Sequence, residues 1–187
     1  FLPILTMSSA SVGPISQAVV NIVNTPSVVS LEKQNNIAAS DLLALNNAKD
    51  QDVKAQKIKA DAIDAYFRVR NMPLEGQGMK MILEAEKNDI DWRLLPAIAI
   101  RESTGGQFAC KKVKYNSFGW GSCKIGFNSN EEAIEIVALN LGGNNPKTEH
   151  YYAGKTTKEI LKKYNPPSVV PHYAEQVISI MDDIGAK

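Results

Sequence analysis

The pattern of apolar and polar residues singles out one central segment. Residues 92–100, with the sequence WRLLPAIAI, are apolar at every position except Arg93. A helix without a polar face must be buried on most of its sides, so the pattern predicts a buried core helix. Asp91 is well placed to cap its start. Pro96, in its second turn, removes one backbone hydrogen bond.

Residues 38–70 have the spacing of a longer helix. Apolar residues recur there every three or four positions, with Lys, Asp and Gln between them, and the face expected to be buried consists of Ala55, Ile58, Ala62, Ala65/Tyr66 and Val69. The polar, alanine-rich part before Gln56 either projects as a solvated stalk or pairs with another helix. The sequence Asn71-Met72-Pro73 ends the helix.

The same spacing predicts further helices at about 78–87, 130–141, 157–164 and 171–185. Ser129 with Glu132, and Thr156 with Glu159, have the spacing of capping boxes. A short hairpin at 120–127 is the one stretch of expected strand. We therefore predict a mostly α fold: a helical domain with long glycine-rich loops, preceded by a long N-terminal helix.

The first 40 residues carry only two charges. The start, FLPIL, is typical of the end of a signal peptide, and Ser8-Ser9-Ala10 supplies small residues for cleavage after Ala10; a disordered tail is the alternative. No run is long enough to predict a transmembrane helix. We expect a signal remnant and linker at 1–37, a helical extension at 38–75, a main domain at 76–187, and a location outside the cytoplasm, secreted or in the cell envelope.

The charge and the cysteines add two further predictions. The net charge is +1, so nothing global indicates nucleic acid or an anionic membrane as a partner. In a secreted protein the spacing of Cys110 and Cys123 is typical of a disulfide; in a cytosolic one it is typical of two free thiols. The N-terminal signal favours the disulfide. Two cysteines without nearby histidines make a poor zinc site, and we expect no metal and no cofactor.

The candidate chemistry lies where the central helix ends, at Arg101-Glu102-Ser103. On helical spacing Glu102 lies on the same face as Ile98 and Ala99, which places a carboxyl at the apolar end of a core helix. Burial raises the pKa of a carboxyl, which can then act as a general acid near neutral pH. A buried ion pair with Arg101 or a loop lysine is the alternative.

A partner for this carboxyl is not visible nearby. No other acid occurs from residue 103 to 130, so the pair of carboxyls used by most glycosidases is missing. Either a second acid arrives from afar, with Glu149 as the loosest candidate, or the reaction needs one carboxyl only.

Four aromatic residues are candidates for a platform under sugar rings, and packing in the core is their alternative role: Phe118, Trp120, Tyr164 and Tyr173. Glycines on both sides of Trp120 favour its exposure in a loop.

The order of these features resembles the lysozyme-like superfamily, most nearly its soluble lytic transglycosylase and goose-type lysozyme branch, with the bacterial glucosaminidases as cousins. The resemblance covers residues 76–184. It rests on the buried helix that ends in Glu102-Ser103, on the segment 116–121 (NSFGWG), on Tyr164-Asn165, and on the Tyr-bearing helix from Tyr173. The family's Gly-Leu-Met-Gln is here GWGS at 119–122, and its Tyr-Asn-Ala-Gly is YNPP at 164–167. Both departures leave the bond cleaved and the product open.

The resemblance implies that 76–187 is a catalytic domain that cleaves peptidoglycan glycan strands between N-acetylmuramic acid and N-acetylglucosamine. Glu102 would be the single general acid and base of a lytic transglycosylase. Tyr164, by family position, would orient Glu102. Ser103 and Asn116 would bind the acetamido group or the carboxylate. The implied substrate-binding residues are Ser103, Asn116, Phe118, Trp120, Asn165 and Tyr173.

Two other classes of function fit the same residues. A non-catalytic peptidoglycan-binding module would use the same cleft, with Glu102 in a structural ion pair. An assembly protein would work through the helix at 38–70 and keep the second half as a scaffold.

Overall fold

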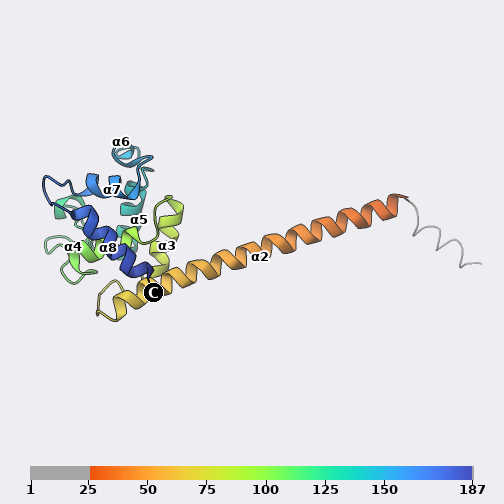
Figure 1. Ribbon diagram of the computed structural model, residues 1–187, viewed down its shortest axis with the longest axis horizontal. Coiled ribbons are helices and arrows are strands. Elements are labelled where there is room, and N and C mark those ends of the chain that lie inside the picture. Colours follow the sequence, from red (N-terminus) through yellow and green to blue (C-terminus); the bar gives the residue numbers. More distant parts are fainter. Residues whose placement is uncertain (1–25, 187) are drawn as a thin grey trace, which may run out of the picture. The chain divides into compact units, whose positions relative to one another are not determined.

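The computed structural model describes residues 26–186, with side chains placed from residue 42 onward. Over these residues the chain forms seven α-helices and one short 3-10 helix, without a strand (Figure 1). The mostly α fold class is therefore confirmed. The signal remnant, with its cleavage site after Ala10, lies outside the described residues.

Helix α2 spans Pro26–Arg68 and begins earlier than residue 38, where the sequence predicted its start. Proline suits the first turn of a helix, and the Leu, Glu, Lys, Gln and Ala residues at 31–39 favour helix over linker. The chain divides into two compact parts, residues 1–51 and 52–187, and α2 runs through the division. The remaining helices all belong to the second part.

The buried face of α2 in the second part differs from the prediction. The buried side chains are Ala60, Ile63, Tyr66 and Phe67, whereas Ile58 and Val69 are 70% and 66% exposed. Only Tyr66 was predicted correctly. Burying the large side chains of Ile63 and Phe67 removes more apolar surface from water than burying alanines does, and these two residues fix which face is turned inward.

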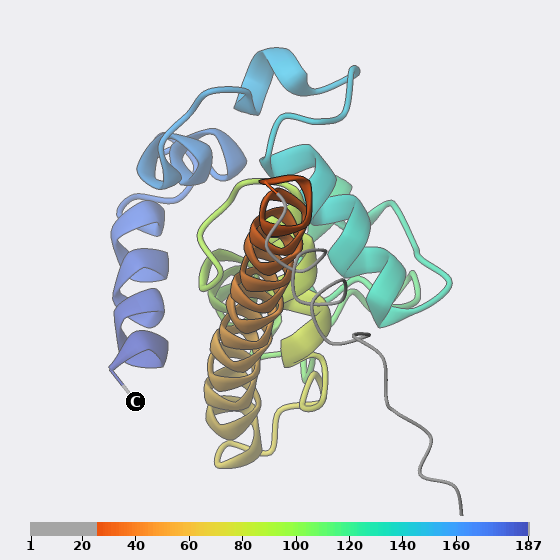
Figure 2. The same ribbon diagram turned by 90° about the vertical axis from the view of Figure 1, so that its right-hand side faces the viewer.

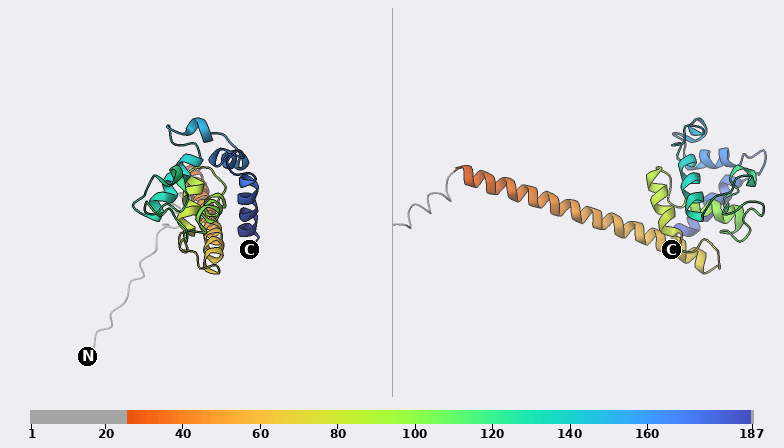
Figure 3. Two further views of the ribbon diagram at one scale, coloured as in Figure 1. Left: turned by 90° about the vertical axis from the view of Figure 1, so that its left-hand side faces the viewer. Right: turned by 180° about the vertical axis from the view of Figure 1, so that it is seen from behind.

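Helix α4 (Leu94–Ser103) is the centre of the second part, and every residue from Leu94 to Ala99 is buried. The predicted core helix is therefore confirmed. Helices α3 (Gly78–Lys87) and α8 (Tyr173–Gly185) pack against α4, and α5 (Asn130–Leu141) packs mainly against α3. Helices α8 and α5 lie on either side of α3 and α4 (Figures 2 and 3).

The start of α4 differs in detail from the prediction, because Arg93 and not Asp91 is the N-cap residue. The carboxylate of Asp91 instead accepts hydrogen bonds from the backbone N–H of Arg93 at 2.9 Å and from its guanidinium at 2.8 Å. The ion pair with Arg93 keeps Asp91 one turn before the helix. The Asp91 side chain thus supports the turn that leads into α4.

Two short helices complete the fold, α6 (Glu149–Tyr152) and α7 (Thr157–Tyr164). The capping box of Thr156 and Glu159 at the start of α7 is confirmed. Ser129 caps α5, but its box is incomplete because the Glu132 carboxylate accepts from the backbone N–H of Asn128. Helix α6 lies between the helices predicted at 130–141 and 157–164, where the sequence analysis predicted no helix. Helix α7 packs against α6 and α8.

The hairpin predicted at 120–127 is absent, and residues 120–123 form the 3-10 helix η1 (Trp120–Cys123). Backbone φ angles are positive at Gly119, Gly121, Ser122 and Cys123. A strand requires extended, negative φ, so this run curls the chain instead. Among the described helices, none combines the length and the apolar character needed to cross a bilayer.

Candidate functional site

Glu102 lies in the last turn of α4, where the chain turns sharply away. Thr104 ends the helix in the left-handed conformation, and Gly105 follows with φ +61°. A side chain at Gly105 would meet Met72, since a Cβ there would lie 2.7 Å from its sulfur. The tight turn leaves the Glu102 carboxyl at the end of a buried helix, facing a cleft.

The partner of the carboxyl is a tyrosine hydroxyl. Tyr173, buried at the start of α8, donates a hydrogen bond from Oη to Glu102 Oε1 at 2.6 Å. This is the only hydrogen bond to the Glu102 carboxyl among the residues that the structure describes. The resemblance had assigned this position to Tyr164, but the Tyr164 hydroxyl donates to the backbone carbonyl of Phe118 instead. The two tyrosine rings stack, with centroids 6.1 Å apart.

Burial raises the pKa of the Glu102 carboxyl above its ordinary value. The hydrogen bond from Tyr173 and the positive charge of Arg101 act in the opposite direction without cancelling the effect of burial. Within the described part of the chain, no ion pair joins Glu102 to a base. Arg101 instead bonds Gln176 at 2.8 Å. The alternative reading of Glu102 as half of a buried ion pair is therefore wrong.

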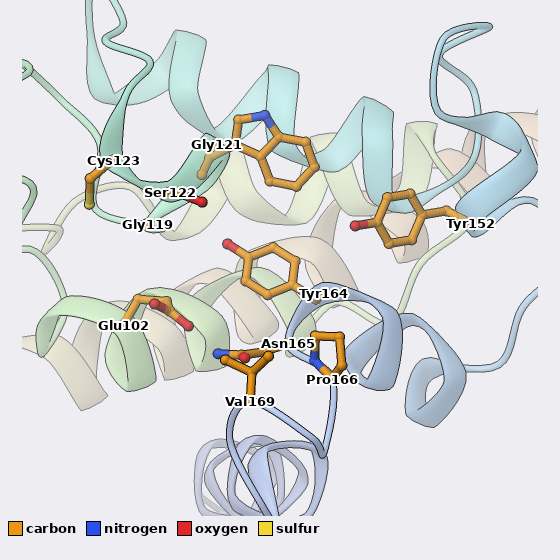
Figure 4. A pocket seen from close by; sticks show the side chains of 11 residues that line it. Glu102, Gly119, Gly121, Ser122, Cys123, Tyr152, Tyr164, Asn165, Pro166 and Val169 are labelled. Carbon is orange, nitrogen blue, oxygen red and sulfur yellow. The ribbon is translucent and has the colours of Figure 1, made fainter.

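The carboxyl opens into a cleft of about 650 Å³. Figure 4 shows Glu102 at one end of the cleft, Tyr152 at the other, and Tyr164 between them. Glu102 is the only acid among the lining residues, which are Glu102, Gly119, Trp120, Gly121, Ser122, Cys123, Tyr152, Tyr164, Asn165, Pro166 and Val169. Glu149, the candidate for a second acid, is exposed at the start of α6 and does not line the cleft.

Gly119 lies directly against the Glu102 carboxyl in this cleft. Its φ is +65°, and a Cβ at this position would lie 2.7 Å from Glu102 Oε2. Gly119 is therefore required for two reasons. Its backbone is left-handed, and the Glu102 carboxyl leaves no room for a side chain. The absence of a side chain leaves Oε2 next to the cleft, while Oε1 is held by Tyr173.

The segment that follows Gly119 forms one wall of the cleft and is fastened at two points. A disulfide joins Cys110 to Cys123, with Cα atoms 5.5 Å apart, as predicted. Asn116 is fully buried and uses its amide on the loop: Nδ2 donates to the carbonyls of Trp120 and Ile125 at 2.8 and 2.9 Å. Its Oδ1 accepts from the N–H of Trp120 at 2.9 Å. All three bonds hold the wall in place.

Three of the predicted ligand-binding side chains therefore have other contacts. Asn116 is occupied by the loop. Ser103 is 3% exposed, and its Oγ lies 2.7 Å from the carbonyl of Ser117 and accepts from the N–H of Gly106 at 2.9 Å. Phe118 is 1% exposed and packs in the core. The polar groups of Ser103 and Asn116 satisfy backbone groups that would otherwise be buried without partners. Phe118 packs in the core. All three residues therefore support the site from below its surface and do not line the cleft.

The other predicted residues do meet at the site. Trp120, Tyr164 and Asn165 line the cleft. Tyr173 does not line it but donates the hydrogen bond that holds Glu102. The rings of Trp120 and Tyr164 have centroids 5.8 Å apart. The cleft thus offers two aromatic surfaces beside one carboxyl. Such an arrangement is suited to bind a ring that has an apolar face and to deliver a proton.

Six lining residues were not among the predicted site residues: Gly119, Gly121, Ser122, Tyr152, Pro166 and Val169. The YNPP segment carried a signal for Pro166, since it follows Tyr164-Asn165 directly. Tyr152 carries no such signal in the sequence, because it lies outside every predicted helix and motif.

Comparisons with protein-family models, curated proteins and solved structures find no match to this chain. Over the described residues, no cluster of His, Cys, Asp or Glu side chains is arranged to hold a metal ion.

Proposed function

We propose that the chain is a lysozyme-like glycosidase that cleaves peptidoglycan with a single carboxyl, as a lytic transglycosylase. The observation that carries the proposal is Glu102. It is the only acid lining the cleft, its pKa is raised by burial, and Tyr173 orients it. A protonated carboxyl beside aromatic surfaces is suited to donate a proton to a glycosidic oxygen.

In the first step the Glu102 carboxyl would transfer its proton to the oxygen between N-acetylmuramic acid and N-acetylglucosamine as the bond to the anomeric carbon breaks. The positive charge at that carbon would be stabilised by the carbonyl oxygen of the substrate's own acetamido group, so that no second carboxyl is needed. The hydrogen bond from Tyr173 stabilises the carboxylate formed in this step.

In the second step the Glu102 carboxylate would take the proton of the muramic C6 hydroxyl, whose oxygen attacks the anomeric carbon and closes a 1,6-anhydro ring. The carboxyl is then protonated again and the cycle is complete. A hydrolase would use water in place of this hydroxyl. The cleft lining contains no other carboxylate, so Glu102 would be the base in either version, and analysis of the products distinguishes the two.

The substrate would lie against Trp120 and Tyr164, because sugar rings present apolar faces that stack on aromatic side chains. Such a substrate places the protein in the cell envelope or outside the cell. The disulfide between Cys110 and Cys123 is of the kind that forms and persists in that oxidising environment.

The proposal is tested by clearing of purified cell walls. Glu102→Gln keeps the shape of the side chain and its contact with Tyr173 but cannot donate the proton, so we expect loss of clearing by at least a hundredfold. Glu149→Gln, which changes an exposed acid outside the cleft, is the matched control and should clear at the wild-type rate. Binding of walls by wild type without any clearing would instead identify a binding module.

A further inference from the structure

Tyr152 has an unusual position for a tyrosine. Its side chain is 8% exposed, yet no described residue forms a hydrogen bond with its hydroxyl. Figure 4 shows this hydroxyl directed along the cleft toward Tyr164. The hydroxyl itself is open to the cleft, since it is not among the buried polar atoms that lack a partner. A ligand bound in the cleft would therefore meet a hydroxyl that forms no hydrogen bond within the described part of the protein.

The backbone that carries Tyr152 is fixed by a buried amide network. Asn140, in α5, accepts from Thr148 Oγ1 at 2.6 Å and from Asn145 Nδ2 at 3.1 Å. Nearby, Gly143 touches the chain just after Tyr152, since a Cβ at Gly143 would lie 2.4 Å from Ala153 Cα. These contacts tie α6 to the end of α5. The hydroxyl of Tyr152 is therefore presented from a rigid support, as a binding group must be.

The chemistry of the Tyr152 hydroxyl limits the classes of ligand that can bind there. Burial raises the pKa of Tyr152, so the group is a neutral phenol that both donates and accepts a hydrogen bond. Sugar hydroxyls and acetamido groups offer both functions. The ring of Tyr164 lies between Glu102 and Tyr152 (Figure 4), so a chain of sugars can follow an aromatic surface from one to the other.

We propose that Tyr152 is a substrate-binding residue that hydrogen-bonds a hydroxyl or acetamido group of a glycan extending along the cleft from Glu102. The inference rests on the proposed function and deepens it, because it makes the ligand an oligosaccharide and assigns a contact far from the bond that is cleaved. Tyr152 contributes binding and takes no part in proton transfer.

The experiment uses the Glu102→Gln protein, which we expect to bind without turnover, and an octasaccharide of alternating N-acetylglucosamine and N-acetylmuramic acid. Tyr152→Phe removes only the hydroxyl. Loss of one neutral hydrogen bond should weaken the Kd by roughly three- to tenfold in calorimetry. Tyr151→Phe is the control: that side chain is 40% exposed, lies outside the cleft lining, and contacts Lys163, whose Nζ is 3.8 Å from the ring centroid. Its Kd should be unchanged.

Thermal melting of the free protein separates binding from a structural role. The hydroxyl of Tyr152 has no protein partner to lose, so Tyr152→Phe should leave Tm at the value of its parent. Equal octasaccharide affinity in the Phe variant, or a lowered Tm, overturns this inference and leaves the proposed function standing. If the Glu102→Gln parent fails to bind the octasaccharide at all, the proposed function fails and this inference fails with it.

Discussion

Replacing Gly119 with alanine tests the geometry around the Glu102 carboxyl. The new Cβ would lie 2.7 Å from Oε2, roughly 0.7 Å inside the 3.4 Å at which ordinary contact begins. The carboxyl cannot yield freely, because Oε1 is held by Tyr173 at 2.6 Å. Alanine at φ +65° also strains the backbone by about 1–2 kcal/mol. The variant should therefore be both less stable and less active.

A matched control separates these two effects. Gly154 has φ +66°, and a Cβ there meets nothing within 4 Å. Gly154→Ala thus carries the same backbone strain without touching the site. The shared backbone strain should lower Tm by about 3–6 °C in each variant, and the contact with the carboxyl should add to the loss in Gly119→Ala. Only Gly119→Ala should lose activity, by ten- to a hundredfold, because a displaced catalytic group of this kind has that effect.

The assays are thermal melting and the initial rate of release of soluble fragments from purified walls, measured well below both melting temperatures. Wild-type rates from Gly119→Ala would refute the placement of Glu102 Oε2 beside Gly119. Equal loss of activity in both variants would show that backbone strain, and not contact with the carboxyl, limits the reaction.

Three further predictions concern the groups around the carboxyl. Tyr173→Phe removes the hydrogen bond that lowers the pKa of Glu102, so the alkaline limb of the pH–rate profile, where the general acid deprotonates, should move to higher pH; an unmoved limb would contradict this role. Glu102→Gln should stabilise the protein, because a carboxyl whose folded pKa is raised contributes stability at low pH that is lost as pH rises through that pKa. The gain in the free energy of unfolding should appear in denaturant melts at pH 8 and vanish in melts below the ordinary pKa of 4.5. An equal gain above and below this pKa would exclude titration of Glu102 as its cause. Removing the disulfide with Cys110→Ser and Cys123→Ser should lower the free energy of unfolding by about 3 kcal/mol, given a sequence separation of 13 residues; identical denaturant midpoints for wild type and the double variant would refute this estimate.

Helix positions follow from the sequence where local signals agree. The capping box at Thr156 and the apolar run of α4 needed no tertiary information. The prediction of which face of α2 is buried was wrong because apolar residues occur on more than one side of that helix. Ile58 and Ile63 are equally apolar, and only contact with the rest of the core selects Ile63.

The site was predictable at its centre and less so at its edges. Glu102 could be found because a carboxyl at the end of an apolar helix conflicts with its surroundings. Ser103 and Asn116 could not be assigned, since a short polar side chain in a turn serves a ligand and the backbone equally well, and here hydrogen bonds go to the backbone. The choice between Tyr164 and Tyr173 as the partner of Glu102 depends on how α7 and α8 pack, because their rings stack on each other.

The central claim is that Glu102 alone performs the acid and base steps on a glycan. Digestion of purified peptidoglycan in H₂¹⁸O, followed by mass spectrometry of the soluble products, tests it most directly. We expect wild type to release fragments with 1,6-anhydromuramic ends that carry no ¹⁸O, and Glu102→Gln to release no fragments. Release of the same fragments by Glu102→Gln, or no release by wild type, would contradict it.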